Sequence, residues 1–339
     1  MLTKGRLKIG VVGVGSIGFR HARLLSYRPD IELYVCDPVP QNLQSALALS
    51  SVAKSTDNFA NLLKYPLDGL VVATPDRFHV EQTEAACRQG IPVLLEKPIA
   101  ENTLQGFQLL QAIREMGAVV LVGYVLRHAE CLNVAKSLLD QGSIGSPVSF
   151  QVMLGAYDTL VLARNRFSAA DRNKIFVDYS HEWDYLQWFL GPVRRCVALS
   201  HQSGQLELTQ NPNVVDGLLE LEKGISGTFH LDYVQSPSHR QLVVVGDQGT
   251  LDIDVVKSRV VLCRRGEDHV SHYHQLQHRD AMMERQHEHF LDIVHKSATP
   301  KVTAEDGVQA LAVADALIRS TESGLWEPVQ NPVNPNKAG

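Results

Sequence analysis

Residues 6–20 read RLKIGVVGVGSIGFR and decide the fold of this chain of 339 residues. An apolar run that ends at Val12 predicts a buried strand. Gly13, Gly15 and Gly18 then fit the spacing G-x-G-x-x-G, in which the first glycine permits a tight turn, the second lets the backbone approach a pyrophosphate, and the third allows close packing of a helix on the strand. The stretch therefore predicts a strand, a turn and the start of a helix whose N-terminus favours a phosphate group.

The residues after the glycine turn continue the pattern of a dinucleotide-binding unit. An amphipathic segment extends to Pro29, which ends the helix, and a second apolar strand covers residues 31–36. Asp37 follows that strand at the distance at which a carboxylate binds the hydroxyl pair of a ribose. The alternative role of Asp37 is to cap the helix that follows Pro40. The glycine turn and the acid together favour the ribose role.

Length and charge exclude several classes of protein. A chain of this length exceeds what one hydrophobic core usually serves, so two domains are expected. The formal net charge of -5 and the pI near 6.3 provide no basic field for nucleic acid or for an anionic membrane. No apolar stretch approaches the roughly 18 residues that a membrane span needs. We therefore expect no nucleic-acid partner and no membrane partner.

Cysteine and histidine usage argues against a disulfide framework and against a metal site. The five cysteines are odd in number, scattered and without a C-x-x-C pair, which is typical of reduced thiols in a cytoplasmic protein. Histidines are frequent between His269 and His289. However, His287 and His289 point to different faces of a helix, and no H-E-x-x-H pattern accompanies them. The sequence predicts a cytoplasmic protein without a bound metal ion.

Residues 1–123 are expected to form the dinucleotide-binding domain. Helical periodicity alternates there with short apolar runs, which predicts about six parallel strands with helices on both faces of the sheet. The strand that begins at Gly69 ends before Thr74 and Pro75, so both lie at the carboxyl edge of the sheet, where ligands bind in such folds. His79 opens the next helix, and its alternative role is to pack on its own loop.

A charged pair follows the next strand. Residues 91–95 predict a buried strand that closes on Glu96, Lys97 and Pro98. The alternative for this pair is a surface ion pair or a turn, because most lysines are solvated. Its position at the same edge of the sheet supports a functional role, because this edge faces the cofactor crevice. Both interpretations stay open on the pattern alone.

Residues 124–339 are expected to form a second α/β domain. From Pro147 the pattern changes to longer strands with hairpin-like turns. The expected strands cover residues 148–153, 195–200, 214–221, 225–234, 241–245, 250–253 and 259–263, and two late helices cover residues 282–295 and 304–321. A large, mainly antiparallel open sheet follows from this pattern. Such sheets commonly bury one face on helices and leave the other for water or a partner, so a homodimer or homotetramer is expected.

The motifs together carry a resemblance to a known family. They are the turn at residues 13–18, Asp37, Ala-Thr-Pro at 73–75, Glu-Lys-Pro at 96–98 and VDYSHEWD at 177–184. With these residues the chain resembles the glucose-fructose oxidoreductase and inositol dehydrogenase family (Gfo/Idh/MocA) nearly end to end. The resemblance implies an N-terminal Rossmann domain and a C-terminal α/β domain whose open sheet often forms the oligomer interface. It also implies hydride transfer between a sugar or polyol alcohol and a nicotinamide cofactor.

The resemblance also implies roles for particular side chains. Lys97 matches the active-site lysine of the family, and His181 and Asp178 match its histidine and acid. Many members place the acid four residues before the histidine and precede it with glycines, whereas Asp178 lies three residues before His181 and Arg172-Asn-Lys174 replaces the glycines.

Chemistry supports these residue types independently. Oxidation of a carbinol needs a base that takes the hydroxyl proton as hydride leaves, and a lysine amine or an imidazole can serve. Asp178 or Asp184 would orient His181 by accepting its second ring N–H, and either acid alternatively caps the helix. The spacing of Tyr179, Trp183, Leu186 and Leu190 favours core positions. The candidates for contact with a polar or anionic substrate are Arg127, Tyr157, Arg164, Arg166, Asp178 and His181, and each of the arginines and the tyrosine alternatively has a structural role.

The cofactor expected from these residues is NAD, with NADP less favoured. Asp37 would repel a 2′-phosphate, and Pro38 stands where an arginine or a serine would help to bind one. The residues expected at the cofactor are Gly13, Gly15, Ser16, Ile17, Gly18, Asp37, Thr74, Pro75, His79, Glu96 and Lys97.

We therefore expect an oxidoreductase that moves a hydride between nicotinamide and a secondary alcohol or ketone of a sugar, polyol or sugar acid. Lys97 and His181 are its expected general acid/base residues. One alternative is a non-catalytic protein that binds dinucleotide and sugar to control a partner, and retention of Lys97 and His181 argues against it. The other is a redox-neutral epimerase or glycosidase, in which the hydride is borrowed and returned.

Overall fold

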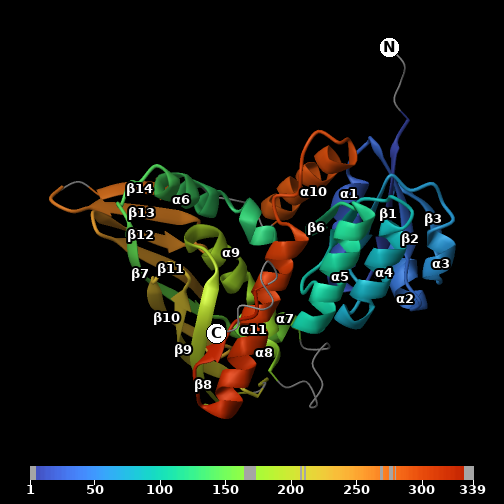
Figure 1. Cartoon of the computed structure of the whole chain (residues 1–339). Helices are drawn as coiled ribbons and strands as arrows, with labels where there is room; N and C mark the ends of the chain where they lie inside the picture. The colour runs from blue at the N-terminus through green and yellow to red at the C-terminus, as the bar shows by residue number, and fades with distance from the viewer. Residues whose placement is uncertain are drawn as a thin grey trace. The chain divides into compact units, whose positions relative to one another are not determined.

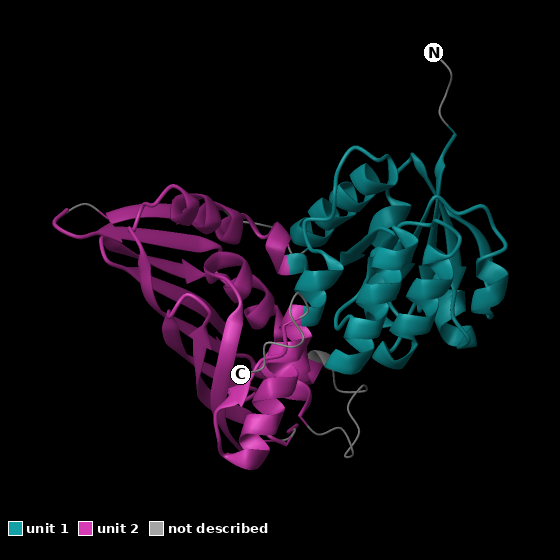
Figure 2. Ribbon diagram, viewed as in Figure 1, with its two compact units in different colours: residues 1–125, 280–308 teal, residues 126–279, 309–339 magenta. Residues whose placement is uncertain are grey.

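The chain divides into two compact units in the computed structural model (Figure 2). The first unit contains residues 1–125 and 280–308, and the second contains residues 126–279 and 309–339. The residues that the structure describes are 5–163, 173–206, 208–209, 211–267, 270–274, 278 and 280–331. Each unit has its own sheet (Figure 1).

The first unit is built on a six-stranded parallel sheet within the described residues. Its strands are β1 (Leu7–Val12), β2 (Ile31–Cys36), β3 (Val52–Thr56), β4 (Gly69–Val72), β5 (Val93–Leu95) and β6 (Val120–Val122), in the spatial order β3-β2-β1-β4-β5-β6. The strand order reverses between β1 and β4, which is the switch point at which such sheets bind ligands. The expectation of a parallel Rossmann sheet is therefore confirmed. The sequence pattern did not locate β3, an edge strand with polar residues.

Helices accompany this sheet in alternation with the strands. They are α1 (Ser16–Ser26), α2 (Pro40–Leu47), α3 (Phe59–Leu62), η1 (Asp76–Phe78), α4 (His79–Cys87), α5 (Thr103–Met116) and the late helix α10 (Ala281–Val294). All residues of β4, β5 and β6 are buried, as expected where helices cover both faces of a parallel sheet.

Helix α10 joins the first unit although it lies near the end of the chain. Asp280, just before α10, accepts hydrogen bonds from Arg20 Nε at 2.8 Å and Arg23 Nη2 at 2.6 Å, both on α1. A Cβ added at Gly69 on β4 would lie 2.9 Å from Val294 Cγ2 and 3.0 Å from Phe290 Cζ, so α10 packs closely on this sheet. This place differs from the expected one in residues 124–339, because periodicity predicts a helix but not the sheet that it covers.

The second unit contains a nine-stranded sheet within the described residues. Its strands are β7 (Pro147–Gly155), β8 (Val193–His201), β9 (Val214–Leu221), β10 (Ser226–Asp232), β11 (His239–Gly246), β12 (Gly249–Asp254), β13 (Arg259–Arg264), β14 (Val270–His274) and β15 (Glu327–Pro328). The spatial order is β14-β13-β12-β11-β7-β10-β9-β8-β15. Only β7 and β10 pair in parallel among these neighbours, so the expected mainly antiparallel sheet is confirmed.

Helices cover one face of the second sheet. The helical segments are η2 (Val125–His128), α6 (Glu130–Asp140), α7 (Tyr157–Ala163), α8 (Lys174–Asp178), α9 (Ser180–Leu190) and α11 (Ala304–Ser323). Trp183 of α9 is buried and packs edge-on against Phe229 of β10, with ring centroids 5.1 Å apart. Tyr179, Leu186 and Leu190 are buried as well, which confirms their expected core positions. Within the described ranges, no helix is long and apolar enough to cross a membrane.

The other face of the second sheet is open to solvent and carries both apolar and charged side chains. Met153, Leu199 and Leu218 are exposed on it. Beside them, His230 of β10 lies between two carboxylates, with Nδ1 2.8 Å from Asp216 Oδ1 and Nε2 3.0 Å from Asp232 Oδ2. The bond to Asp232, opposed in part by burial and reinforced by the bond to Asp216, raises the pKa of His230 to about 9.

This raised pKa predicts a pH-dependent stability. A raised folded-state pKa means that protonated His230 stabilises the fold below the unfolded value of 6.5, and that this contribution disappears as the pH rises through about 9. We expect the free energy of unfolding to fall by about 1 kcal/mol over this interval, after allowance for solvent screening of a partly exposed group. Urea denaturation at a pH below 6.5 and at a pH above about 9 measures the change in the free energy of unfolding. In His230→Gln the free energy of unfolding should depend less on pH. An unaltered pH dependence would contradict the stabilising role of protonated His230.

Candidate functional site

The glycine turn after β1 is dictated in part by the packing of the chain on itself. Gly13 has a φ of +78°, and a Cβ there would lie 2.7 Å from the carbonyl oxygen of Ala73 and the amide nitrogen of Thr74. A Cβ at Gly18 would overlap the carbonyl oxygen of Gly13. Both positions therefore require glycine, one for the turn and one for the close approach of α1 to the turn.

Gly15 differs from these two glycines. Its φ of -69° and ψ of -157° are extended values that other residues adopt, and a Cβ there would meet no heavy atom within 4 Å. The chain itself thus gives no reason for glycine at this position. Gly15 is the N-cap of α1 and makes no side-chain cap hydrogen bond, so the amides of Ser16 and Ile17 begin the helix at this point. The open space there fits a phosphate that approaches the backbone, as in dinucleotide sites.

Asp37 lies beside the glycine turn, as the sequence predicts. Its buried carboxylate accepts a hydrogen bond from the amide of Val14 at 2.8 Å and another from the amide of Val39 at 2.8 Å. The side-chain amide of Asn42 donates a third bond at 3.1 Å. Val39 is the N-cap of α2, so Asp37 bonds the residue before this helix, and none of these three bonds comes from a backbone amide of α2 itself. A carboxylate has about four acceptor positions, so these three bonds leave capacity for a ribose hydroxyl.

His79 connects two loops at the carboxyl edge of the sheet. Its buried ring has Nε2 2.8 Å from the carbonyl oxygen of Thr74 and Nδ1 2.7 Å from that of Pro98. Thr74 itself donates from its hydroxyl to Gln82 Oε1 at 2.8 Å, and Pro75 is the N-cap of η1. This geometry matches the structural alternative for His79, because the ring ties the segment after β4 to the segment after β5.

Glu96 and Lys97 follow β5 at the same edge. Glu96 is only 8% exposed, so it is not part of a surface ion pair. Burial by itself would raise the pKa of the Glu96 carboxyl, but the hydrogen bond from His21 and the positive charge of Lys97 hold that pKa below its usual range. The amide of Lys97 donates to Glu96 Oε2 at 3.2 Å. Lys97 is half-buried, and the Lys97–Pro98 peptide bond is cis.

Asp178 and His181 lie close together in the chain of the second unit. Asp178 ends α8 and accepts a hydrogen bond from Tyr233 Oη at 2.8 Å, and His181 stands in the first turn of α9. Both side chains are half-buried. No local sequence pattern indicates Tyr233 as a partner of Asp178, because the two residues lie 55 positions apart.

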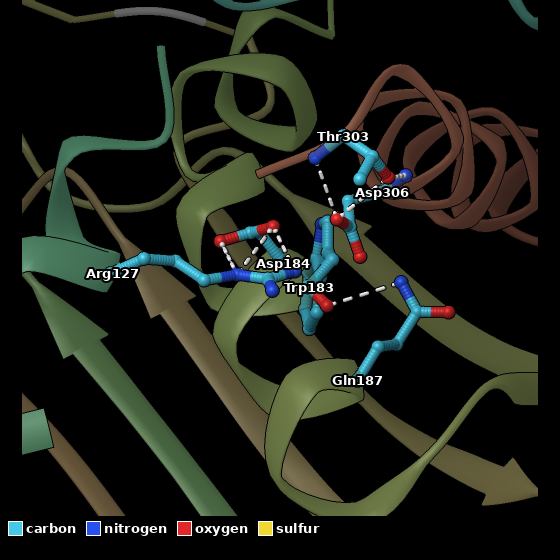
Figure 3. A network of polar contacts seen from close by, with 6 residues as sticks. All are labelled: Arg127, Trp183, Asp184, Gln187, Thr303 and Asp306. Carbon is cyan, nitrogen blue, oxygen red and sulfur yellow. Dashed lines mark hydrogen bonds and ion pairs between the residues drawn. The ribbon is translucent and has the colours of Figure 1, made fainter. Parts of the chain in front are cut away.

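Arg127 and Asp184 form a buried ion pair, which Figure 3 shows with the guanidinium facing the carboxylate. Arg127 Nε lies 3.1 and 3.0 Å from the two carboxylate oxygens, and Nη2 lies 2.7 Å from Oδ1. The two residues are 4% and 1% exposed. The structural alternative for Arg127 therefore accounts for its position, and the same ion pair accounts for Asp184.

The remaining candidates for substrate contact are Tyr157, Arg164 and Arg166. Tyr157 begins α7, is half-buried and accepts a hydrogen bond from the amide of Leu208 at 3.4 Å. Arg164 and Arg166 lie outside the described residues. Among the residues that the structure describes, no group of three or more His, Cys, Asp or Glu side chains is placed to hold a metal ion.

Sequence reasoning missed a functional candidate in His21. This residue is three positions beyond Gly18, and its ring is fully buried between His287 and Glu96. A polar residue on the buried face of α1, directly after the glycine turn, was the available signal. For His287 the sequence pattern raises only the question of a metal site.

Two family models match the chain. One is described as an oxidoreductase family with an NAD-binding Rossmann fold and matches residues 7–124. The other is described as the C-terminal alpha/beta domain of an oxidoreductase family and matches residues 136–330. Among individual proteins, the scyllo-inositol 2-dehydrogenase (NAD(+)) of Bacillus subtilis (strain 168) is 24% identical over 96% of each chain.

Solved structures share the fold over nearly the whole chain. The scyllo-inositol dehydrogenase from Lactobacillus casei, with bound NAD(H) and scyllo-inositol, has a TM-score of 0.81 and 22% identity, over 96% of this chain and 99% of that one. The WlbA dehydrogenase from Bordetella pertussis, in complex with NADH and UDP-GlcNAcA, has a TM-score of 0.79 and 22% identity, over 97% of this chain and 99% of that one.

The contrast between Gly15 and Gly13 predicts separate effects on binding and stability. Gly15→Ala should retain or slightly increase the free energy of unfolding, by up to about 1 kcal/mol, because its backbone suits alanine. Its affinity for NADH should fall by about tenfold or more, because the methyl group fills the space next to the helix N-terminus. Gly13→Ala is the matched control and should lose about 1–3 kcal/mol of stability. Fluorescence titration and urea denaturation provide the two readouts, and unchanged NADH binding by Gly15→Ala would refute the site.

Proposed function

The chain belongs to the Gfo/Idh/MocA family of oxidoreductases, and on this premise we propose that it is an NAD-dependent dehydrogenase of a sugar, polyol or sugar acid. The reaction moves a hydride between the nicotinamide and a secondary alcohol or its ketone. The observation that carries this proposal is the arrangement at one edge of the first sheet, where the open space at Gly15 and the half-buried Lys97 both follow parallel strands.

The residues of the first unit fit a bound dinucleotide. The N-terminus of α1 would bind the pyrophosphate, and Asp37 would accept a ribose hydroxyl. Thr74, Pro75 and Glu96 shape the neighbouring strand ends. When bound, the nicotinamide supplies the acceptor or donor of the hydride.

We assign the proton transfer to Lys97 and His181. In the oxidation, the carbinol C–H bond breaks and its hydrogen would leave with the electron pair as hydride to the nicotinamide. The O–H proton passes to the neutral Lys97 amine, and the C–O bond becomes a carbonyl. In the reverse direction, protonated Lys97 returns the proton to the oxygen. His181 acts as a second acid/base group, with Asp178 as the acid that supports it. Tyr157 remains a candidate for substrate binding.

The substrate class is a ring or chain with a secondary alcohol. The names of the similar proteins include an inositol dehydrogenase and a dehydrogenase bound to UDP-GlcNAcA, so cyclic polyols and sugar acids are the first compounds to assay. The exposed apolar side chains of the open sheet face support a homodimer or homotetramer formed by face packing. All five cysteines are free thiols, which supports a reducing, cytoplasmic location.

Asp37 predicts the choice between the two nicotinamide cofactors. A buried carboxylate at the ribose position repels a 2′-phosphate, and the next residue is Pro38, which offers no cationic group. We expect NADH to bind at least about tenfold more tightly than NADPH. Asp37→Ser should narrow this ratio by weakening NADH binding and relieving the repulsion. Equal or tighter binding of NADPH by the parent protein would contradict the NAD assignment.

The role of Lys97 is tested with a panel of polyols, sugars and sugar acids assayed for NADH formation. On the compound with the fastest turnover, Lys97→Met should lower kcat by about 10² to 10⁴, while NADH affinity changes little. His181→Ala should also lower kcat, and the double variant should lose less than the sum if both groups serve one proton transfer. Near-normal turnover of Lys97→Met would overturn the mechanism. Confirmed binding of a compound without any turnover would favour a regulatory protein.

A further inference from the structure

Three buried side chains form a hydrogen-bonded chain that ends at Lys97. His287 of α10 has Nε2 2.7 Å from Nδ1 of His21 on α1, and His21 Nε2 lies 2.9 Å from Glu96 Oε1. The exposed fractions of His287, His21 and Glu96 are 2%, 0% and 8%. The second oxygen of Glu96 accepts the amide of Lys97 at 3.2 Å. All four residues belong to the first unit, and the two histidines are 266 residues apart in sequence.

The direction of the bond between His21 and Glu96 follows from the carboxylate, and the direction of the bond between the two rings follows if each ring carries one proton. The lowered pKa of Glu96 keeps it ionised, so both its oxygens only accept hydrogen bonds. His21 therefore donates from Nε2, and a neutral His21 accepts at Nδ1 from the Nε2–H of His287. With one proton on each ring, every donor in the chain points toward Glu96.

The carboxylate at the end of this chain has little freedom to turn. A Cβ added at Gly123, after β6, would lie 2.9 Å from Glu96 Cα and 3.0 Å from Glu96 Oε2. Gly123 therefore leaves no room for a side chain beside Glu96 Oε2, while His21 bonds Oε1. On the far side of the same segment, His79 binds the carbonyl oxygen of Pro98. Buried side chains thus hold the peptide group before Lys97 and the one that follows Pro98.

We propose that His287 is a positioning residue for Lys97, acting through His21 and Glu96. The inference rests on the catalytic role proposed for Lys97 and adds a residue outside both the glycine turn and the Glu-Lys-Pro segment. Loss of the His287 bond leaves His21 free to change its tautomer or rotate, and the carboxylate that holds the Lys97 amide then loses its fixed orientation. A displacement of the order of 1 Å at a catalytic group costs up to about a hundredfold in rate.

The position of α10 does not depend on this bond. Asp280 binds Arg20 and Arg23 at the start of the helix, and Phe290 packs on Gly69 of β4 further along. Variants of His287 should therefore fold with α10 in place. His289 provides a matched control on the same helix, since its Nε2 accepts the amide of Lys301 at 2.9 Å and its bond leads away from Glu96.

The test compares His287→Leu, His287→Gln and His289→Leu in the full-length protein. His287→Leu should lower kcat by about tenfold to a hundredfold while KM for NAD stays within about twofold, because only the lysine is displaced. His287→Gln should recover most of the loss, because the glutamine amide places an N–H donor close to the position of Nε2. His289→Leu should keep the parent kcat. A purely structural role of His287 would instead lower the thermal stability of His287→Leu without a selective loss of kcat.

A second readout does not depend on turnover. In protein labelled with ¹⁵N in the histidine rings, His21 should show a protonated Nε2 and an unprotonated, hydrogen-bonded Nδ1. His287→Leu should shift the Nδ1 signal, and His287→Gln should restore it. Normal kcat in His287→Leu, with Lys97→Met inactive, would overturn the inference alone. Full turnover of Lys97→Met would overturn the proposed function, whatever the histidine spectra show.

Discussion

The burial of one charge, the Glu96 carboxylate, constrains the whole carboxyl edge of the first sheet. Placing a carboxylate in a nearly dry environment costs several kcal/mol unless hydrogen bonds and opposite charge compensate it. The compensation comes from separate parts of the chain, with His21 on the helix after the glycine turn and the amide of Lys97 directly after Glu96. His21 is in turn bonded to His287 of α10, a helix from the end of the chain that other contacts hold in this unit. The glycine turn, the Glu-Lys-Pro segment and α10 are therefore parts of one structure.

Steric constraints act at the same edge. Gly13 and Gly18 are required because the turn, α1 and the segment after β4 touch one another at backbone distance. That contact fixes the N-terminus of α1, so the space at Gly15 stays open. Asp37 also restrains the turn, because its carboxylate accepts a hydrogen bond from the amide of Val14. A phosphate site and a ribose site are thus formed by contacts that the chain makes with itself.

The sequence predicted these features to the extent that they are local. The buried strands β1, β2 and β4 are apolar runs, so their pattern identifies them. The strands that the pattern missed, β3, β14 and β15, all lie at sheet edges, where one side lacks a neighbour and polar residues are tolerated. The glycine spacing likewise indicated the turn. By contrast, the pairing of Arg127 with Asp184 and of His21 with His287 joins residues 57 and 266 positions apart, and no local pattern reports it.

In the second unit, as in the first, buried carboxylates held by partner side chains lie next to the acid/base candidate, which here is His181. The residues beside it on α9 include Glu182, which lies 2.9 Å from Arg240 Nε of β11, and Asp184, which binds Arg127. On a helix, positions 182 and 184 project on different sides of position 181, so the two ion pairs restrain α9 from two directions. Buried ion pairs contribute little net stability, because desolvation offsets their attraction. Their geometry, however, fixes how a helix is rotated. In both units a half-buried acid/base candidate, Lys97 or His181, is therefore the immediate chain neighbour of a buried carboxylate that is itself held by a buried or half-buried cationic or imidazole side chain.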